Sequence, residues 1–178
     1  MDFVSRRRRG DREIWKGAAA GALGGLVASW AMNEFSTILS KVAEVSANGN
    51  KRKSQGNGQQ QEDPTMVTAE KILETFAGVR LNKDQKKKAG DVVHYAFGTL
   101  MGAVYGAAAE MRPEVKSLFG LPYGAALFVG ADEVTLPALG LAKKPTEYPI
   151  TRHLSGLSQH LVYGLTTELV RQAVREKL

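Results

Sequence analysis

Long stretches without charged residues alternate along the chain with short, strongly charged ones. Four long stretches are nearly free of Asp, Glu, Lys and Arg, and they lie at residues 17–39, 92–109, 118–141 and 154–170. About 20 apolar residues in a helix cross the ~30 Å hydrocarbon core of a membrane. A helix on the surface of a soluble protein needs a polar face instead. The pattern therefore predicts an all-α fold, an integral membrane bundle of four transmembrane helices.

The segment between the first two predicted spans is long and polar. Residues 46–63 are rich in Gly, Asn and Gln and have no hydrophobic periodicity, which is typical of a disordered loop. Residues 65–78 follow, and their apolar positions recur at helical spacing. We expect a short amphipathic helix there, lying on the membrane or against the bundle. A helix over a soluble core would have the same pattern.

Small residues recur at steps of four in every predicted span. The glycines that we expect at helix contacts are Gly17, Gly21, Gly25, Gly98, Gly102, Gly106, Gly124, Gly156 and Gly164. Small residues four apart let two helix backbones approach closely, which is how helices associate in lipid. The repetition predicts tight packing within the bundle, against a second copy of the chain, or against a partner in a larger membrane complex.

Five ionisable residues fall inside the predicted spans, and they are Glu34, His94, Asp132, Glu133 and His160. A charge at mid-bilayer costs at least about 2.5–3.5 kcal/mol, so such groups face protein or water rather than lipid. A helix rises about 1.5 Å per residue. With antiparallel spans, this rise places all five in the half of the bundle that holds the end of the first span. We expect one polar network there.

This polar cluster leaves several chemistries open. A proton relay needs only histidine and carboxylate within hydrogen-bond reach. Histidine and carboxylate also suit zinc, iron or manganese, although the spacing matches no helical Glu-x-x-His or His-Glu-x-x-His site. A haem between His94 and His160 is a further alternative. A purely structural network would use the same residues, so the metal and cofactor stay undetermined.

Other ionisable residues lie near the ends of the predicted spans. We interpret Glu168 and Arg171 as an ion pair at the membrane interface, where long side chains reach water. Glu110, which is followed closely by Pro113, marks the end of a helix. His153 is interpreted as an interface residue.

The composition narrows the functional classes. The net charge is +6, but the basic residues flank apolar segments and no aromatic residues are interleaved with them. This arrangement favours anionic lipid headgroups over nucleic acid. The chain has no cysteine, which excludes disulfides and thiolate sites. No phosphate-binding loop and no nucleophile elbow is present, so we do not expect an enzyme.

The distribution of basic residues also predicts a topology. Residues 1–16 form a basic N-terminal tail that contains Arg6–Arg9, and such a tail favours the cytoplasmic side. Four spans then return the C-terminus to that side. The first span is too long for the apolar part of a signal peptide, so we expect it to stay uncleaved. Residues 17–178 are thus expected to form a single multi-pass membrane domain.

Three stretches carry a family resemblance, namely HYAFGTLMGAVYGAAAEMRP (His94–Pro113), GLPYGAALFVGADEVTLPALGLAKKP (Gly120–Pro145) and SQHLVYGLTTELVRQ (Ser158–Gln172). They resemble the YagU-like inner-membrane proteins, a bacterial family of unknown function, and Trp15–Phe35 resembles that family's first span. The resemblance implies an all-helical inner-membrane protein and carries no catalytic residues. We therefore expect a structural or accessory membrane subunit. The alternative is a buried His/carboxylate site for proton handling or for a metal or haem.

Overall fold

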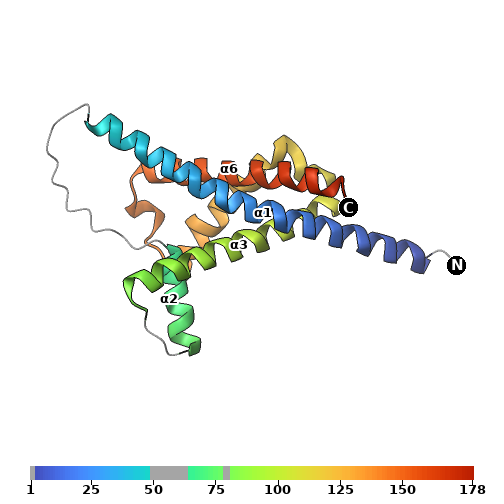
Figure 1. Cartoon of the computed structure of the whole chain (residues 1–178), viewed down its shortest axis with the longest axis horizontal. Helices are drawn as coiled ribbons and strands as arrows, with labels where there is room; N and C mark the ends of the chain where they lie inside the picture. Colours follow the sequence, from blue (N-terminus) through green and yellow to red (C-terminus); the bar gives the residue numbers. More distant parts are fainter. Residues whose placement is uncertain (1–2, 49–63, 78–80) are drawn as a thin grey trace.

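The computed structural model describes residues 3–48, 64–77 and 81–178, which form helices and connecting turns without any strand (Figure 1). The all-α fold is therefore confirmed. The three long helices are α1 (Phe3–Asn48), α3 (Lys83–Met111) and α6 (Ile150–Arg175). Residues 49–63, the main part of the expected disordered loop, lie outside the described residues.

Helix α1 extends beyond the first predicted span at both ends. Residues 3–16, which we expected as a basic tail, belong to the helix, which ends only at Asn48. No proline interrupts this segment, and proline is the residue that most strongly breaks a helix. The C-terminal part of α1, drawn in cyan, extends past the rest of the bundle in Figure 1.

Helix α3 contains the second predicted span and begins earlier in the sequence. Asn82 caps its first turn, since its side chain accepts a hydrogen bond from the backbone N–H of Gln85. The Gln85 side chain in turn accepts one from the backbone N–H of Asn82, and both bonds are 2.9 Å long. The helix ends at Met111, just before Pro113. The amphipathic helix predicted for residues 65–78 is α2 (Pro64–Ala77).

Helix α2 packs against the beginning of α3 rather than standing alone. The Nζ atom of Lys86 lies 2.7 Å from Oε2 of Glu70. A Cβ atom at Gly90 would lie 2.8 Å from Cγ of Met66, so the two helices touch closely. Contact with the bundle, one of the positions left open for this helix, is therefore observed.

The third predicted span is not one regular helix. A 3₁₀ segment, η1 (Pro113–Gly120), precedes α4 (Leu121–Leu127), and a π-helical segment, η2 (Phe128–Thr135), leads into α5 (Leu136–Ala138). Leu118 and Phe119 have φ values of 49° and 52°, a left-handed conformation that non-glycine residues rarely adopt. The helical path therefore begins at Leu121, not at residue 118.

After α5, the chain returns to the bundle through a short segment. This segment contains a 3₁₀ turn, η3 (Pro145–Glu147), and leads directly into α6. The fourth predicted span, residues 154–170, lies inside α6.

The glycine stripes of α1 and α3 lie against each other. A Cβ atom at Gly21 would overlap the carbonyl oxygen of Gly102, and one at Gly106 would overlap that of Gly17. Gly25 and Gly98 continue the stripe, because a Cβ at Gly25 would overlap the carbonyl oxygen of Gly98. The contacts pair the beginning of α1 with the end of α3, so these helices are antiparallel.

Helix α6 packs on α1 and α4 in the same way. A Cβ atom at Gly124 would overlap the carbonyl oxygen of His160, and one at Gly164 would overlap that of Gly120. Gly156 lies against the ring of Phe128, where an added Cβ would lie 2.7 Å from a ring carbon. All nine glycines of the predicted stripes therefore make contacts within the chain.

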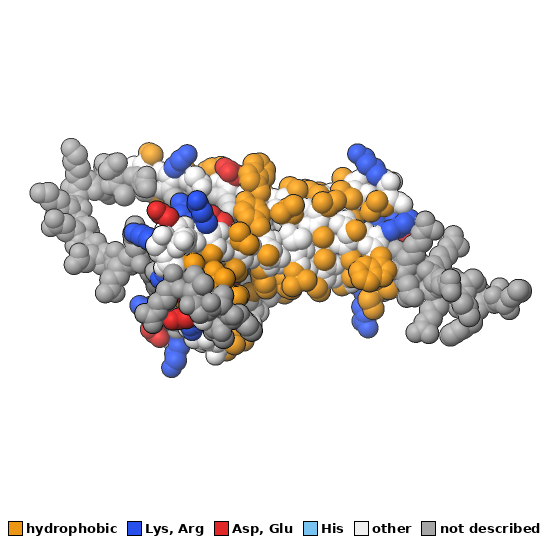
Figure 2. Space-filling model, turned by 60° about the horizontal axis from the view of Figure 1, so that its bottom comes forward, with side chains coloured by type: hydrophobic (Ala, Val, Ile, Leu, Met, Phe, Trp, Pro, Cys, Tyr) orange, Lys and Arg blue, Asp and Glu red, His pale blue; other side chains and the backbone are white. Residues whose placement is uncertain are grey.

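Large apolar side chains cover the outside of the bundle, whereas small and polar ones fill its interior. Ala20, Ala28 and Ser29 are fully buried, while Leu100 and Val104 are 58% and 54% exposed. Figure 2 shows hydrophobic side chains over the middle of the molecule and Lys, Arg and acidic side chains toward both ends. The molecule thus carries an apolar belt between two charged ends.

Among the described residues, one helix, α3, is long and apolar enough to cross a membrane. Its sequence from residue 92 to residue 109 has no charged residue.

Candidate functional site

A cavity of about 920 Å³ lies between α1, α2, α3, η2 and α6 at one end of the bundle. Its wall combines apolar side chains such as Phe97, Met101 and Phe128 with ionisable ones. The ionisable residues on the wall are Asp91, His94, Asp132, Glu133, Lys143, Arg152 and His160. Four of the five residues of the predicted polar cluster thus line a single cavity.

His160 and Asp132 face each other at this wall. His160 is buried, and its Nδ1 atom lies 3.0 Å from the carbonyl oxygen of Gly156. A carbonyl only accepts hydrogen bonds, so Nδ1 carries the proton. The other ring nitrogen, Nε2, lies 3.9 Å from Oδ2 of Asp132, which is beyond hydrogen-bond distance. The two side chains therefore share the wall without a direct hydrogen bond between them.

Glu133 points to a different histidine from Asp132. Its Oε1 atom lies 2.8 Å from Nδ1 of His153, and the Nε2 atom of His153 lies 3.1 Å from the carbonyl oxygen of Pro145. Both partners are acceptors, so the doubly protonated imidazolium satisfies both. The hydrogen bond to Glu133 accordingly raises the pKa of His153 above its ordinary value of 6.5.

We interpreted His153 as an interface residue and did not place it with the predicted cluster. A pattern in the sequence could have included it. His153 precedes His160 by seven residues, which is close to two helical turns, so the two rings lie on the same side of α6. Arg152 was also missed, and its guanidinium stacks over the ring of Tyr148 at 4.3 Å.

His94 lies on the α3 side of the cavity. Its Nε2 atom is 3.3 Å from the carbonyl oxygen of Ser29 on α1, and the buried Ser29 hydroxyl donates to the carbonyl oxygen of Gly25 at 2.9 Å. The Nε2 atom therefore donates its proton across the helix contact. This bond joins the two helices, and the Nδ1 atom of His94 takes no part in it.

Glu34 is placed apart from the other predicted residues. Its side chain is exposed, and it is not among the residues that line the cavity. The neighbouring residue Asn33 does line it and lies 3.4 Å from the hydroxyl of Tyr95. The structure therefore brings together Asp132 with His160 and Glu133 with His153, and it leaves Glu34 outside.

A buried column of tyrosines closes the inner end of the cavity. The Tyr163 hydroxyl donates a 2.5 Å hydrogen bond to the carbonyl oxygen of Gly98. The ring of Tyr123 lies 6.2 Å from that of Tyr163 and 4.4 Å from that of Tyr105. Tyr105 and Tyr163 are almost completely buried. Aromatic packing therefore separates the cavity from the opposite end of the bundle.

The opposite end is closed by ion pairs. Glu168 is 0% and Arg171 4% exposed, and two hydrogen bonds of 2.6 and 2.9 Å join them. Arg175 bonds to Glu110 at 2.9 Å and also to Glu13, so α6 is tied to α3 and α1. The hydrogen bond to Glu110 raises the pKa of Arg175.

This burial corrects one interpretation. Glu168 and Arg171 do not form an exposed pair at an interface, because small neighbours such as Gly164 and Gly24 let α1 and α4 close over them. Glu110 does stand just before the end of α3 at Met111, as its position before Pro113 predicted.

The arrangement at the cavity is one of pairs. Within the described residues, no three His, Asp or Glu side chains are grouped so that they could hold a metal ion. The pairs can accept, donate and exchange protons, and they can bind a polar group placed between them.

The molecule is thus a helical bundle with an apolar belt, one closed end and a polar cavity at the other. The chain belongs to the DUF1440 family, a family of proteins of unknown function, which matches residues 60–169. The matched region runs from just before α2 into α6 and includes most of the cavity wall. No curated protein and no solved structure matches the chain.

Proposed function

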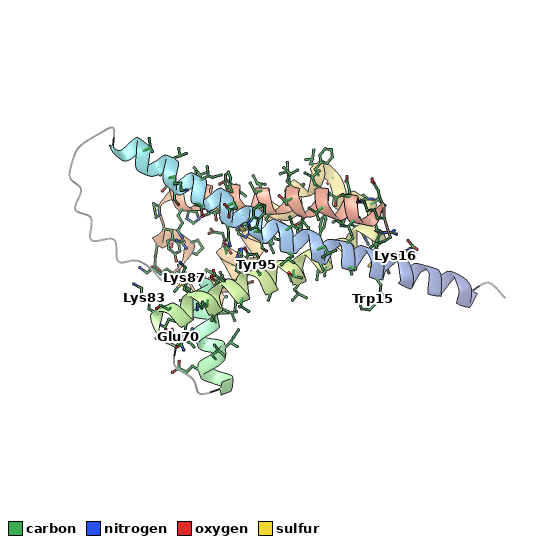
Figure 3. The ribbon with its side chains drawn as sticks, in the orientation of Figure 1. Trp15, Lys16, Glu70, Lys83, Lys87 and Tyr95 are labelled. Carbon is green, nitrogen blue, oxygen red and sulfur yellow. The ribbon has the colours of Figure 1, made fainter. Side chains whose placement is uncertain are left out.

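We propose that the protein crosses a membrane with four helical segments, formed by α1, α3, the run from α4 to α5, and α6. The belt of exposed Leu and Val around a core of Gly, Ala and Ser supports this proposal. Figure 3 places Lys16 beside the end of α6 and Lys83 and Lys87 at the far end of α3. Basic residues at both ends of an apolar belt suit the two headgroup layers of a bilayer.

The proposed topology places both termini in the cytoplasm and the protein in a bacterial inner membrane, like the YagU-like proteins that the sequence resembles. The ion-paired end, which contains Glu13 and Arg175, then lies on the cytoplasmic side. The cavity opens toward the other side. The basic residues in 1–16 support this orientation.

We further propose that the cavity is a binding site in the membrane, with His160 and Asp132 as its proton-exchanging recognition pair. The observation that carries this proposal is the 3.9 Å gap between Nε2 and Oδ2 on the cavity wall. Nε2 accepts a hydrogen bond when the ring is neutral and donates one when it is protonated. Binding of a polar group there would therefore depend on pH.

A purely structural or accessory role is the second candidate. It was expected to use the glycine stripes for contact with a second copy or a partner. These glycines contact other helices of the same chain, so a partner would have to bind a different surface. The geometry therefore favours the cavity over the stripes as the functional feature.

The experiment that tests the cavity uses the absence of cysteine in the chain. A cysteine replaces Gly130, which lines the cavity and has no atom within 4 Å of an added Cβ. In the control variant, a cysteine replaces Val104 on the apolar belt, where the side chain is exposed in the structure. Both variants are treated in intact membranes with a charged, water-soluble thiol reagent.

We expect the reagent to modify Gly130→Cys and to spare Val104→Cys, because water fills the cavity and lipid covers the belt. Modification of both cysteines would contradict the membrane proposal. Protection of Gly130→Cys would contradict an open cavity. The pairing of His160 with Asp132 is tested by NMR of the His160 ring, whose signals should change in Asp132→Asn. Unchanged signals in that variant would exclude the pair.

A further inference from the structure

The cavity wall carries two pairs of residues that each combine a carboxylate with an imidazole. The first is the Asp132 pair, Asp132 on η2 with His160 on α6, whose Oδ2 and Nε2 atoms lie 3.9 Å apart. The second is the Asp91 pair, Asp91 and His94, both on α3. Asp91 precedes His94 by three residues, which places the two on one side of the helix. All four residues line the cavity.

Both imidazole rings direct a proton to a backbone carbonyl oxygen rather than to the cavity. The Nδ1 atom of His160 donates to Gly156 at 3.0 Å, and the Nε2 atom of His94 donates to Ser29 at 3.3 Å. A ring that carries one proton has one nitrogen that donates and one that accepts. The acceptors are Nε2 of His160 and Nδ1 of His94, and neither makes a hydrogen bond within the described residues. His160 is only 7% exposed, and a buried acceptor without a partner favours a ligand that donates.

The hydroxyl groups behind these pairs offer no proton to the cavity either. The Ser29 hydroxyl donates to a carbonyl oxygen of its own helix at 2.9 Å, and the Tyr163 hydroxyl donates to one on α3 at 2.5 Å. The amides of Asn33 and Gln159 also line the cavity, and an amide presents both donors and acceptors. The inner wall therefore favours a ligand that donates hydrogen bonds and carries positive charge.

The two pairs do not converge on one point. Within the part of the chain that the structure describes, no three His, Asp or Glu side chains are grouped so that they could hold one ion. A ligand that uses both pairs must therefore have two separate donor groups. Phe97, Met101 and Phe128 line the same cavity, and these side chains suit a hydrocarbon segment that joins the two groups.

Two basic residues, Lys143 and Arg152, also line the cavity, and both are exposed. The guanidinium of Arg152 stacks on the ring of Tyr148 at 4.3 Å. Arg152 precedes His160 by eight residues, which is about 12 Å along a helix. Water and salt screen exposed charges over such distances, so these residues do not prevent a cation from binding beside the buried His160.

We propose that the cavity binds a linear aliphatic diamine in its doubly protonated form. One ammonium group pairs with Asp132 and donates to Nε2 of His160, and the other pairs with Asp91 and donates to Nδ1 of His94. The methylene chain packs against the apolar part of the wall. An ionised carboxylate has about four acceptor sites, so Asp132 can take an ammonium group in addition to its other contacts. This inference rests on the proposed membrane cavity and names the class of its ligand.

Isothermal titration calorimetry of the full chain in a non-ionic detergent tests this proposal. The probes are the linear terminal diamines from diaminopropane to diaminoheptane, each with the monoamine of the same number of carbon atoms. We expect one diamine to bind about tenfold more tightly than its monoamine, because a second charge-assisted hydrogen bond adds a factor of about ten. The length of the diamine that binds best reports the separation of the two pairs.

Three variants locate the two ammonium groups. Asp91→Asn and Asp132→Asn each leave one carboxylate, so in either variant the diamine should bind no more tightly than the monoamine. Glu34→Gln is the matched control, because Glu34 is exposed and does not line the cavity. This variant should keep the tenfold preference. Thermal unfolding of each variant establishes that it is folded.

Equal binding of every diamine and its monoamine by the unaltered protein would overturn the proposal. A preference for the diamine that persists in Asp91→Asn or Asp132→Asn, or that disappears in Glu34→Gln, would overturn it as well. If Gly130→Cys is modified by the aqueous reagent and no diamine is preferred, only this inference fails. If Gly130→Cys is protected, the proposed function fails with it.

Discussion

The two ends of the bundle use the same kinds of side chain for opposite results. At one end, Glu168 and Arg171 are buried and joined by two short hydrogen bonds. At the other, Asp132 and His160 stand 3.9 Å apart on the wall of a cavity. A carboxylate and a cation in direct contact satisfy each other and close the structure at that end, whereas the second pair makes no direct hydrogen bond and lines an open cavity.

The backbone explains this difference between the ends. Gly17 and Gly21 on α1 let α3 approach until the backbones touch, and Gly24 does the same for α6. Farther along α1, residues 26–48 contain no glycine, and Met32, Asn33 and Ser36 line the cavity. Glycine therefore lets the helices touch at one end, and the cavity lies at the end where α1 has none.

The comparison is tested most severely by removing one carboxylate at each end. Glu168→Gln removes the closest charged partner of the buried Arg171 and leaves Glu110, whose Oε1 atom lies 3.6 Å from the guanidinium. Breaking a buried pair costs about 3–5 kcal/mol, so we expect a large loss. The Asp132 side chain is 40% exposed, so water screens its interactions and the effect of Asp132→Asn on stability should be much smaller. Thermal unfolding in detergent measures both. Equal losses in the two variants would mean that the ends do not differ in this way.

Two glycines give the next largest contrast. Gly102→Ala places a methyl group on the carbonyl oxygen of Gly21, whereas Gly130→Ala places one where no atom lies within 4 Å. Overpacking of this kind costs about 1–3 kcal/mol. We expect Gly102→Ala to lower the unfolding temperature and Gly130→Ala to leave it nearly unchanged. Similar unfolding temperatures for both variants would contradict the observed packing.

The sequence predicted the long helices well because each depends on local patterns. The charge-free stretch of residues 92–109, the glycines at steps of four and the apolar spacing of residues 65–78 all correspond to observed helices. The rise per residue along a helix is nearly constant, so the depth of each ionisable residue in the bundle could be calculated. That calculation placed His94, Asp132 and His160 at the same end, and all three line the cavity.

Rotation about the helix axis could not be predicted in the same way. Glu34 has the right depth and yet is exposed, because its side of α1 faces away from the cavity. Asp132 and Glu133 are neighbours in sequence, and the π-helical segment η2 directs them to two different histidines. Left-handed Leu118 and Phe119 follow no local sequence pattern either. These features depend on tertiary packing.

A smaller effect is expected from the tyrosine that closes the cavity. Tyr163→Phe removes the 2.5 Å hydrogen bond to the carbonyl oxygen of Gly98 and leaves that buried group without a side-chain donor. A hydrogen bond of this kind contributes about 0.5–1.5 kcal/mol. Tyr95→Phe, whose hydroxyl makes only a 3.4 Å contact with Asn33, is the matched control. Tyr163→Phe should lower the unfolding temperature more than Tyr95→Phe does. A larger decrease in Tyr95→Phe would contradict the structure.

The smallest effect concerns the pH dependence of the open end. His153 joins Glu133 on η2 to the carbonyl oxygen of Pro145, in the segment that covers part of the cavity, and Tyr148 and Arg152 are the other polar residues beside it. Its pKa is raised by the bond to Glu133. The stabilisation that protonated His153 gives this segment is therefore complete below its ordinary pKa of 6.5. It is lost as pH rises through the raised pKa of the folded protein.

A fluorinated label on Thr146→Cys, an exposed position in the same segment, reports its mobility by ¹⁹F NMR. We expect the signal of the otherwise unchanged protein to sharpen as the pH is raised above neutrality, because the neutral ring of His153 can donate only one of its two hydrogen bonds. The closed end provides the contrast, since no histidine takes part in its ion pairs among the described residues. Adding His153→Gln should remove the pH dependence of the label. If the label sharpens equally with His153→Gln present, another group controls this segment.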